Sequence, residues 1–390
     1  MSGAHHVAGF TSTGSKRPAT LFGETGPDLP VRMTRSSGYR VWDERGREFI
    51  DYIMGLGAVA LGYGHPEVAR AVGEAVAAGV VGPLAPVAEE ELAGDLARLI
   101  PWMEQVRFLK SGAEAVAAAV RIARVATGRE YVLGCGYHGW LDWCHGGEGV
   151  PRATRALYDE LPFNDAAVAR ELIRATGDRL AAVVFEPLVV QEPDPQWLEV
   201  LREESDRIGA VLVVDEIKTV GRLAVGGACE RYGIRPDLVV IGKAIANGFP
   251  LAAVGGRADL MGAVSRTWIS STLATEFVSL AAARATLGVI ETQRVPEHLH
   301  RVGGRLLSGL EALHRRYPNL VSGVGGVAEM CFLQYADEAV SRAVSSACAQ
   351  AGVLFKRSAY NFVSLAHTEP VIDRTLELLA QALSTAVKTA

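Results

Sequence analysis

Asp237-Leu-Val-Val-Ile-Gly-Lys243-Ala-Ile-Ala-Asn-Gly-Phe-Pro250 places a lysine directly after a short apolar run and before a glycine-bearing loop. Upstream, Val211-Leu-Val-Val-Asp215-Glu216 is a second apolar run, and it ends in acid. Runs that are apolar at every position are typical of strands buried on both faces of a parallel sheet. We therefore predict two neighbouring buried strands, one ending at Asp215 and the other just before Lys243.

This lysine and aspartate have a specific chemical implication. A pyridoxal phosphate enzyme requires such a pair at the ends of neighbouring strands. Its lysine forms the Schiff base, and its carboxylate keeps the pyridine nitrogen protonated. Each residue also has an ordinary explanation, because a strand-end lysine can reach water and Asp215 can form a structural salt bridge. Their joint occurrence favours the cofactor.

Alternating strands and helices surround this pair. Further strands are predicted at 106–109, 130–133 and 181–185, and helices at 66–79, 87–100, 114–126, 165–176 and 195–208. In open parallel sheets, helices connect the strands and ligands bind beyond the carboxyl ends of the strands. The pattern predicts an α/β fold with a mostly parallel sheet. Helices at 295–316, 336–351 and 370–388, with short strands at 328–334 and 362–366, predict a smaller α+β domain after it.

Three more groups of residues are predicted at the carboxyl edge of this sheet. Ser111-Gly112-Ala113 joins a strand to a helix, so its backbone N–H groups can bind phosphate, or Ser111 can act only as a helix cap. Tyr137-His138-Gly139-Trp140 follows another strand and can stack on a cofactor ring or pack in the core. Glu186-Pro187 ends a third strand, where an acid can also be solvated or cap a turn.

The composition argues against several other classes of protein. The net charge of −5, without a basic stripe, argues against a nucleic-acid partner. The five cysteines form no CxxC pair, so we expect reduced thiols and no metal site. Residues Met1 to Arg17 lack the apolar core of a signal peptide, and no apolar run is long enough for a membrane span. We expect a cytoplasmic protein without a membrane partner.

The N-terminal part has its own pattern. Residues 1–30 are rich in Gly, Ser, Thr and Pro and are predicted to form an extended or partly mobile arm. Tyr39–Asp43 and Glu48–Asp51 flank a turn and are predicted to pair as a hairpin. We expect an N-terminal arm with small-domain strands over 1–55, a large cofactor-binding domain over 56–288 and a small C-terminal domain over 289–390.

The ordered motifs of the chain resemble those of the class III aminotransferases, which are pyridoxal phosphate enzymes of fold type I. Among these, the glutamate-1-semialdehyde aminomutase branch is the most similar. The resemblance extends from about residue 38 to the end of the sequence. The motifs that carry it are Leu61-Gly-Tyr-Gly-His65-Pro66, Ser111-Gly-Ala-Glu114-Ala, Arg121-Ile-Ala-Arg124, Thr127-Gly-Arg129, Tyr137-His138-Gly139, Glu186-Pro187, Asp215-Glu216-Ile-Lys-Thr219, Pro236-Asp237, Gly242-Lys243, Gly255-Gly256-Arg257 and Ala366-His367-Thr368-Glu369. These motifs are specific for the fold and the cofactor and much less specific for the substrate.

The resemblance implies a large domain with a mostly parallel seven-stranded sheet, and a role for each matching residue. Lys243 would be the Schiff-base lysine, and Asp215 would pair with the pyridine nitrogen. The other implied cofactor contacts are Ile217 and Tyr137 on the two ring faces, His138 beside Tyr137, Glu186 near the ring hydroxyl, and Ser111, Gly112 and Ala113 around the phosphate. Thr272 matches a threonine that family members donate to the phosphate of the neighbouring subunit's cofactor, which implies a homodimer.

The chain departs from the aminomutase pattern mainly at substrate positions. An arginine that receives the substrate carboxylate falls on Thr20, with Arg17 close by, and a C-terminal pocket glutamate falls near Asn361. Asn164 matches a position that lines the pocket, and Trp140 can shape an apolar part of it or belong to an interface. These departures argue against glutamate semialdehyde as the substrate.

The leading hypothesis is therefore an aminotransferase that moves an amino group between a small-molecule amine donor and an oxo acceptor, on a specialised substrate such as those of secondary metabolism. An intramolecular aminomutase and a racemase or epimerase are alternatives, because they use the same cofactor residues. A further alternative is a non-catalytic homologue that binds pyridoxal phosphate. The presence of both Lys243 and Asp215 argues against it.

Overall fold

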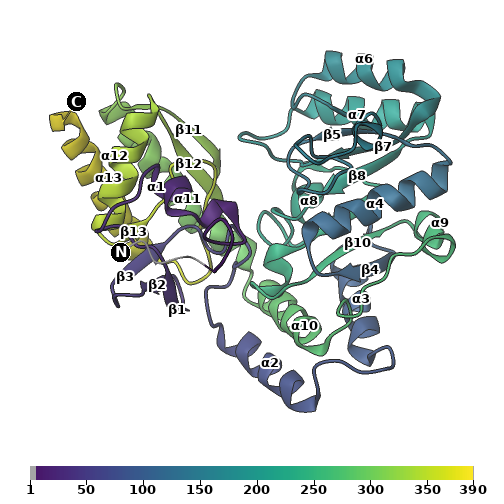
Figure 1. Cartoon of the computed structure of the whole chain (residues 1–390), viewed down its shortest axis with the longest axis horizontal. Helices are drawn as coiled ribbons and strands as arrows, with labels where there is room; N and C mark the ends of the chain where they lie inside the picture. Colours follow the sequence, from purple (N-terminus) through teal and green to yellow (C-terminus); the bar gives the residue numbers. More distant parts are fainter. Residues whose placement is uncertain (1–5, 390) are drawn as a thin grey trace. The chain divides into compact units, whose positions relative to one another are not determined.

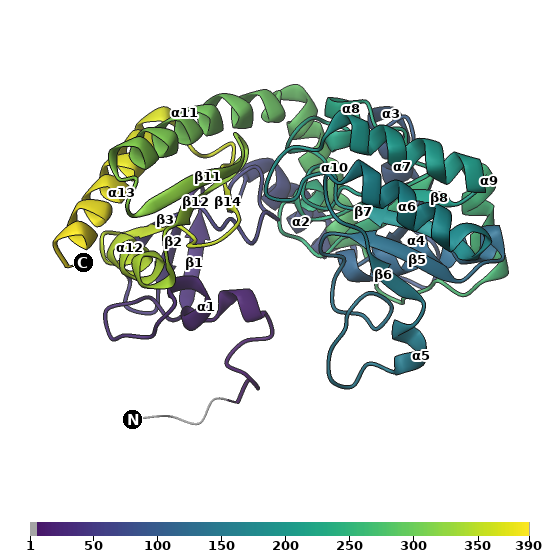
Figure 2. The same ribbon diagram turned by 90° about the horizontal axis from the view of Figure 1, so that it is seen from above.

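The structure, a computed structural model, describes residues 6–389 of the chain (Figures 1 and 2). The first five residues of the expected N-terminal arm lie outside the described part. The chain divides into two compact units. One is Pro66–Glu297, and the other combines Met1–His65 with His298–Ala390.

The unit Pro66–Glu297 is built on a seven-stranded sheet. Its strands are β4 (Gln105–Leu109), β5 (Tyr131–Cys135), β6 (Tyr158–Glu160), β7 (Leu180–Phe185), β8 (Val211–Asp215), β9 (Leu238–Ile241) and β10 (Ala252–Gly256). They are arranged in the order β4-β10-β9-β8-β7-β5-β6. Only β10 runs against its neighbours, pairing antiparallel with β4 and β9. The predicted α/β fold with a mostly parallel seven-stranded sheet is confirmed.

Helices cover both faces of this sheet (Figure 1). Helix α4 (Gly112–Thr127) packs on one face, and α6 (Ala166–Thr176) and α7 (Pro195–Ile208) pack on the other. In β8, Val211 and Val213 belong to the cluster under α4, whereas Leu212 and Val214 belong to the cluster under α6 and α7. Both faces of the strand are buried, which explains why its sequence is apolar at every position before the terminal Asp215.

The remaining helices of this unit lie around the sheet. They are α2 (Pro66–Ala78), α3 (Val87–Leu99), α5 (Arg152–Arg155), α8 (Gly227–Tyr232), α9 (Ala258–Met261) and α10 (Phe277–Thr292), with the 3-10 turns η2 (Gly177–Arg179), η3 (Lys243–Ala246) and η4 (Gly262–Arg266). Helix α10 packs against α2 and α3. It was not expected from the sequence, because its own apolar residues lie on all sides of the helix and do not form an amphipathic stripe.

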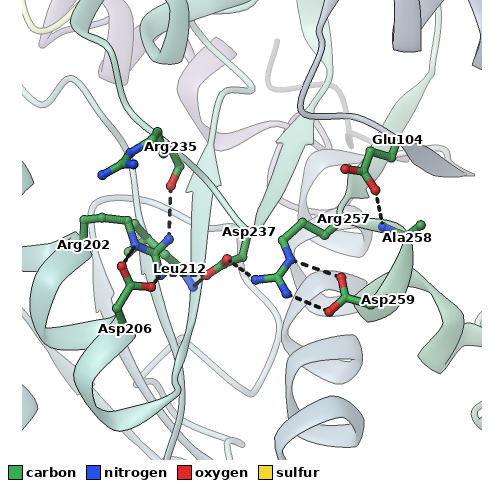
Figure 3. Close-up of polar contacts among 9 residues, drawn as sticks. All are labelled: Glu104, Arg202, Asp206, Leu212, Arg235, Asp237, Arg257, Ala258 and Asp259. Carbon is green, nitrogen blue, oxygen red and sulfur yellow. Dashed lines mark hydrogen bonds and ion pairs between the residues drawn. The ribbon is translucent and has the colours of Figure 1, made fainter.

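A network of charged residues joins the strands at their amino ends (Figure 3). The carboxylate of Asp237, just before β9, accepts hydrogen bonds from the Leu212 backbone N–H at 2.8 Å and from Arg202 and Arg257 at 3.0 Å each. Arg257 also donates to Asp259. A buried carboxylate is stabilised only when it is fully paired, so this network fixes the start of β9 beside β8.

The second unit contains two smaller sheets. Strands β1 (Met33–Ser37), β2 (Arg40–Asp43), β3 (Glu48–Asp51) and β13 (Val353–Leu354) form one, and β11 (Val321–Val327), β12 (Met330–Tyr335) and β14 (Asn361–Phe362) form the other. The helices are α11 (Val295–Arg316), which begins in the first unit, α12 (Glu338–Gln350) and α13 (Glu369–Thr389). Figure 2 shows α11 lying along β11 and β12. The expected hairpin is present as β2 and β3, which pair antiparallel.

The prediction of an extended N-terminal arm is wrong in part. Residues Gly14–Lys16 form the short turn η1, and Pro18–Phe22 form the helix α1. Pro18 stands at the start of α1, where its fixed φ favours a helix, and Gly23 ends it with a φ of 76°. Phe22 and Leu29 are buried in a cluster with Ala349, so apolar packing holds this segment in place. None of the helices within residues 6–389 is both long enough and apolar enough to cross a membrane.

Candidate active site

The residues that follow five strands of the large sheet gather at one edge. Strands β5, β7, β8 and β9 are parallel, so Tyr137, Glu186, Asp215 and Lys243 all lie at the carboxyl edge. Strand β4 has the same direction, because β4 and β9 are both antiparallel to β10, and this adds Ser111. The structure therefore brings together the lysine, the two acids, the aromatic loop and the predicted phosphate loop within one unit.

Asp215 is buried and held by His138. The distance from His138 Nδ1 to Asp215 Oδ2 is 2.8 Å, and the two side chains are 0% and 1% exposed. The second oxygen of Asp215 accepts a hydrogen bond from the Ile217 backbone N–H at 3.2 Å. Burying a carboxylate is costly unless it is hydrogen-bonded, so His138 stabilises Asp215 and fixes its orientation. His138 Nε2 is also buried and has no hydrogen-bond partner among residues 6–389.

The loop that carries His138 is packed against the beginning of α4. The ring of Trp143 stacks on the His138 ring, with centroids 6.1 Å apart and an interplanar angle of 23°. Gly139 has a φ of 104°, and a Cβ there would lie 2.5 Å from the Cβ of Ala113. The close approach requires glycine at 139, and it places the aromatic loop directly against the predicted phosphate loop.

The Ser111-Gly112-Ala113 segment is both a helix cap and an accessible helix N-terminus. Ser111 Oγ accepts from the Glu114 backbone N–H at 3.3 Å, and Glu114 Oε2 accepts from the Ser111 backbone N–H at 2.9 Å. This capping box leaves the N–H groups of Gly112 and Ala113 without intrahelical acceptors. A Cβ at Gly112 would lie 2.5 Å from Ile217 Cδ1, so glycine allows the two loops to approach closely. Backbone N–H groups in this position suit a phosphate.

Lys243 opens η3 in a left-handed conformation, with a φ of 49°, and is half-buried. Burial of its amine, followed by the positive charge of Lys218, lowers the pKa of Lys243 to about 8. The carboxylates of Glu186 and Asp215 oppose this shift, and Arg222 adds to it. A lysine with this pKa is partly neutral near pH 8, as a nucleophilic amine must be.

Two acids of this region have partners that the sequence did not indicate. Glu186 Oε1 pairs with Lys218 Nζ at 2.9 Å, and Glu186 Oε2 accepts from the Tyr137 backbone N–H at 3.0 Å. Glu216 is buried and accepts from the backbone N–H groups of Ala228 and Cys229 at 2.9 and 2.6 Å, so it ties the loop after β8 to α8. Burial raises the pKa of Glu216. Lys218 was not identified from the sequence, although it stands between Asp215 and Thr219 in a matching motif.

The remaining predicted residues are found in three kinds of environment. The side chains of Tyr137 and Trp140 are 70% and 71% exposed at the edge of the sheet, and Thr272 is exposed in the turn before α10. Asn164 ties down a loop, donating to Glu192 O at 2.9 Å and accepting from Asp194 N–H at 2.8 Å.

Thr20 and Asn361 belong to the other unit. Thr20 is exposed on α1. Asn361 is buried, and both ends of its side-chain amide bond the backbone of Lys356, at 2.5 and 3.1 Å.

The carboxyl edge fits pyridoxal phosphate. A half-buried amine of lowered pKa, a buried carboxylate oriented by a histidine, and a glycine-bearing helix N-terminus stand at the ends of adjacent strands. These groups match the aldehyde, the ring nitrogen and the phosphate of the cofactor in charge and hydrogen-bonding capacity. Within residues 6–389, no group of three or more His, Cys, Asp or Glu residues could hold a metal ion.

Comparison with known proteins also indicates a pyridoxal phosphate enzyme. The family described as Aminotransferase class-III matches residues 22–387. The glutamate-1-semialdehyde 2,1-aminomutase of Thermomicrobium roseum is 35% identical over 412 residues, which cover 96% of this chain and 95% of that protein.

Two solved structures share the fold at appreciable sequence identity. The pyridoxal phosphate form of the FumI protein of Sphingopyxis sp. MTA144 has a TM-score of 0.89 and 28% identity, covering 95% of this chain and 94% of that one. A β-phenylalanine aminotransferase from Variovorax paradoxus has a TM-score of 0.84 and 28% identity, covering 93% and 90%. The chain therefore belongs to the class III aminotransferases, enzymes that use pyridoxal phosphate.

Proposed function

We propose that this enzyme transfers an amino group between a specialised amine and an oxo compound, with Lys243 as the residue that carries the cofactor. The observation that carries the proposal is the edge formed by β8 and β9, where the amine of Lys243 has a pKa of about 8 and Asp215 is held by His138. Bound pyridoxal phosphate supplies an aldehyde that condenses with amines and a ring that withdraws electrons from the adjoining carbon.

The chain's own groups divide the remaining work. Asp215 would hold a proton on the ring nitrogen, and His138 would keep its carboxylate in a fixed orientation. Lys243 Nζ, which is partly neutral near pH 8, would accept and return a proton of the substrate. The N–H groups of Gly112 and Ala113 would hold the phosphate, and Ile217 and Tyr137 would contact the ring.

Reduction with borohydride tests the role of Lys243. In the chain loaded with pyridoxal phosphate, reduction should fix the cofactor on the lysine that carries it, and peptide mass mapping should find the added mass on Lys243. The K243A variant should carry no such mass and should lose the visible absorbance band of the bound cofactor. A band that survives K243A unchanged would refute the assignment.

Substrate screening then tests the reaction. We expect loss of the absorbance band with amine donors, together with an oxo product detectable by mass spectrometry. Two features support an intermolecular transfer: the similarity to a β-phenylalanine aminotransferase, and the chain's Thr20 at the position matched to a carboxylate-binding arginine. Donors whose amine is not α to a carboxylate should therefore be included.

An intramolecular aminomutase is the second candidate, because the relative from Thermomicrobium roseum carries that name. The two reactions differ in their need for an acceptor. A single substrate added without an oxo acceptor should stop after one half-reaction in an aminotransferase and should turn over continuously in an aminomutase. Glutamate-1-semialdehyde is the substrate with which to make this comparison.

We further propose a homodimer in which Thr272 reaches the phosphate of the partner's cofactor. Trp268 and Leu273, on either side of Thr272, are 81% and 52% exposed. Leu84 is 82% exposed in a neighbouring segment, which is joined to this turn by the Phe277 N–H bond to Val80 O at 2.9 Å. Exposed apolar groups of this size are typical of a surface covered by another subunit.

Mixed dimers test the contribution of Thr272 directly. Each dimer of one K243A and one T272A subunit would hold one site with both residues intact if Thr272 acts across the interface. Mixing the two variants after unfolding and refolding should then raise the activity above the average of the two variants measured separately. Mixtures whose activity equals that average would refute a contribution across the interface.

A further inference from the structure

A second lysine with little exposure to water, Lys218, lies at the same carboxyl edge as Lys243. Lys218 follows β8 and is 12% exposed; its Nζ is 2.9 Å from Glu186 Oε1 and 3.3 Å from Leu188 O. Its partner Glu186 is 7% exposed, so both charges are largely removed from water. An ion pair in such a place contributes strongly to the local field, because little solvent screens it.

The pair joins three loops of the carboxyl edge. Lys218 belongs to the loop after β8, and Glu186 to the loop after β7. The second oxygen of Glu186 accepts from the Tyr137 backbone N–H at 3.0 Å, which adds the loop after β5. Gly136 has a φ of 103°, and a Cβ there would lie 2.6 Å from Glu186 Oε2, so the backbone approaches this carboxylate closely.

The charges around Lys243 depend on this pair. Two cations, Lys218 and Arg222, lower the pKa of its amine, and two carboxylates, Glu186 and Asp215, raise it. Asp215 is already engaged by His138 at 2.8 Å. Glu186 is engaged by Lys218. Because Lys218 both repels a charged Lys243 and neutralises Glu186, its removal would change two of the four influences in the same direction.

We propose that Lys218 is a positioning residue whose ion pair holds Glu186 and the Tyr137 loop in place for the cofactor and whose charge increases the neutral fraction of the Lys243 amine. The inference rests on the proposed function, in which Lys243 carries the cofactor. Lys218 would then differ from a structural lysine, because its positive charge, and not only its packing, would affect Lys243 and Glu186. A neutral amine is the form that attacks an aldehyde.

Competitive labelling of amines measures the pH midpoint of Lys243 without any reaction of substrate. The full cofactor-free chain is treated with a trace of acetic anhydride at a series of pH values, and peptide mass mapping gives the labelling rate of Lys243 at each. We expect a midpoint near pH 8 in the wild type. In K218M the midpoint should rise by about one pH unit, which lowers the rate about tenfold at a fixed pH below the midpoint.

Matched variants separate charge from packing. K218R keeps the charge and should leave the midpoint within about 0.3 pH units of the wild type. E186Q removes a carboxylate and should lower the midpoint, and K218M/E186Q should return toward the wild-type value. K356M removes a half-buried lysine from the other unit and should leave the midpoint of Lys243 unchanged.

The bound cofactor supplies a second measurement. In the holoenzyme, the pH dependence of the visible absorbance band should shift in K218M and remain close to the wild type in K218R. An unchanged Lys243 midpoint in K218M, or equal shifts in K218M and K218R, would overturn the proposal. If K218M does not fold, K218Q decides, because it also removes the charge but keeps a polar side chain, and the proposal requires an upward shift of the Lys243 midpoint. A band that does not depend on Lys243 would refute the proposed function instead, and the cofactor-free labelling would still test Lys218.

Discussion

The buried contact between His138 and Asp215 gives a quantitative prediction. Their 2.8 Å bond joins side chains that are 0% and 1% exposed, so removing His138 leaves Asp215 buried with the weaker 3.2 Å bond from the Ile217 N–H. In H138L, an apolar side chain replaces the imidazole, and the carboxylate of Asp215 loses this hydrogen bond. We expect the free energy of unfolding of the cofactor-free chain to fall by about 3 kcal/mol.

A double-mutant cycle isolates this contact. D215N removes the charge, so in the H138L background it should cost little or even stabilise the chain. We expect a coupling energy of about 2 kcal/mol between the two changes, measured by urea unfolding with linear extrapolation. H138L should also weaken binding of pyridoxal phosphate, measured by equilibrium dialysis, because Asp215 would lose its fixed orientation.

D237N provides the matched control. Asp237 is also a buried and fully bonded carboxylate, but it contacts Leu212 at the opposite end of β8, roughly 10 Å from Asp215 at about 3.3 Å per residue. D237N should lower stability without affecting cofactor binding, and its effect should add to that of H138L within about 0.5 kcal/mol. Additive effects of H138L and D215N, within the same margin, would refute the reasoning about their contact.

Three further predictions follow from single residues. G112A places a Cβ 2.5 Å from Ile217 Cδ1 and should weaken cofactor binding about tenfold, whereas G112A/I217V, which lacks that methyl group, should recover much of the affinity in a titration of the absorbance band. G139A combines a φ of 104° with an overlap against Ala113 and should lower the free energy of unfolding by about 2 kcal/mol, with G304A in α11, whose added Cβ would meet no atom within 4 Å, as its control. Hydrogen bonds from Arg174, only partly opposed by burial, lower the pKa of Glu204 from 4.5 to about 2. The stability from Glu204 is therefore complete above pH 4.5 and is lost as the pH falls through about 2, so the urea midpoints of E204Q and wild type should differ at pH 7 and converge at low pH, and a gap independent of pH would contradict this linkage.

Much of the fold could be predicted because burial on both sides of a strand leaves a direct record in the sequence. The runs that form β7 and β9 are apolar at every position, β8 is apolar up to its terminal Asp215, and the structure buries all three strands. The reversed direction of β10 has no such record, since its short Ala252–Gly256 run looks like any buried strand. Direction is decided by pairing with β9, the preceding strand, and with β4, which is distant in sequence.

The candidate site divides in the same way. Asp215 and Lys243 could be predicted from their place at the ends of apolar runs. The partner of Asp215 could not, because His138 lies 77 residues away and only the folded sheet brings them together. The pairing of Lys218 with Glu186 was hidden for the same reason, as the two belong to loops after different strands. Sequence patterns report what each element buries and are silent about which side chains meet between elements.

The charged network around Asp237 has a consequence for how this enzyme can change. Its bonds to Leu212, Arg202 and Arg257 tie the strands together at the end remote from the reacting groups. The groups that hold the strands together and the candidate site therefore lie at opposite ends of β8 and β9. We therefore expect substitutions in the loops at the carboxyl edge to leave the strands assembled, because the Asp237 network holds them at the other end.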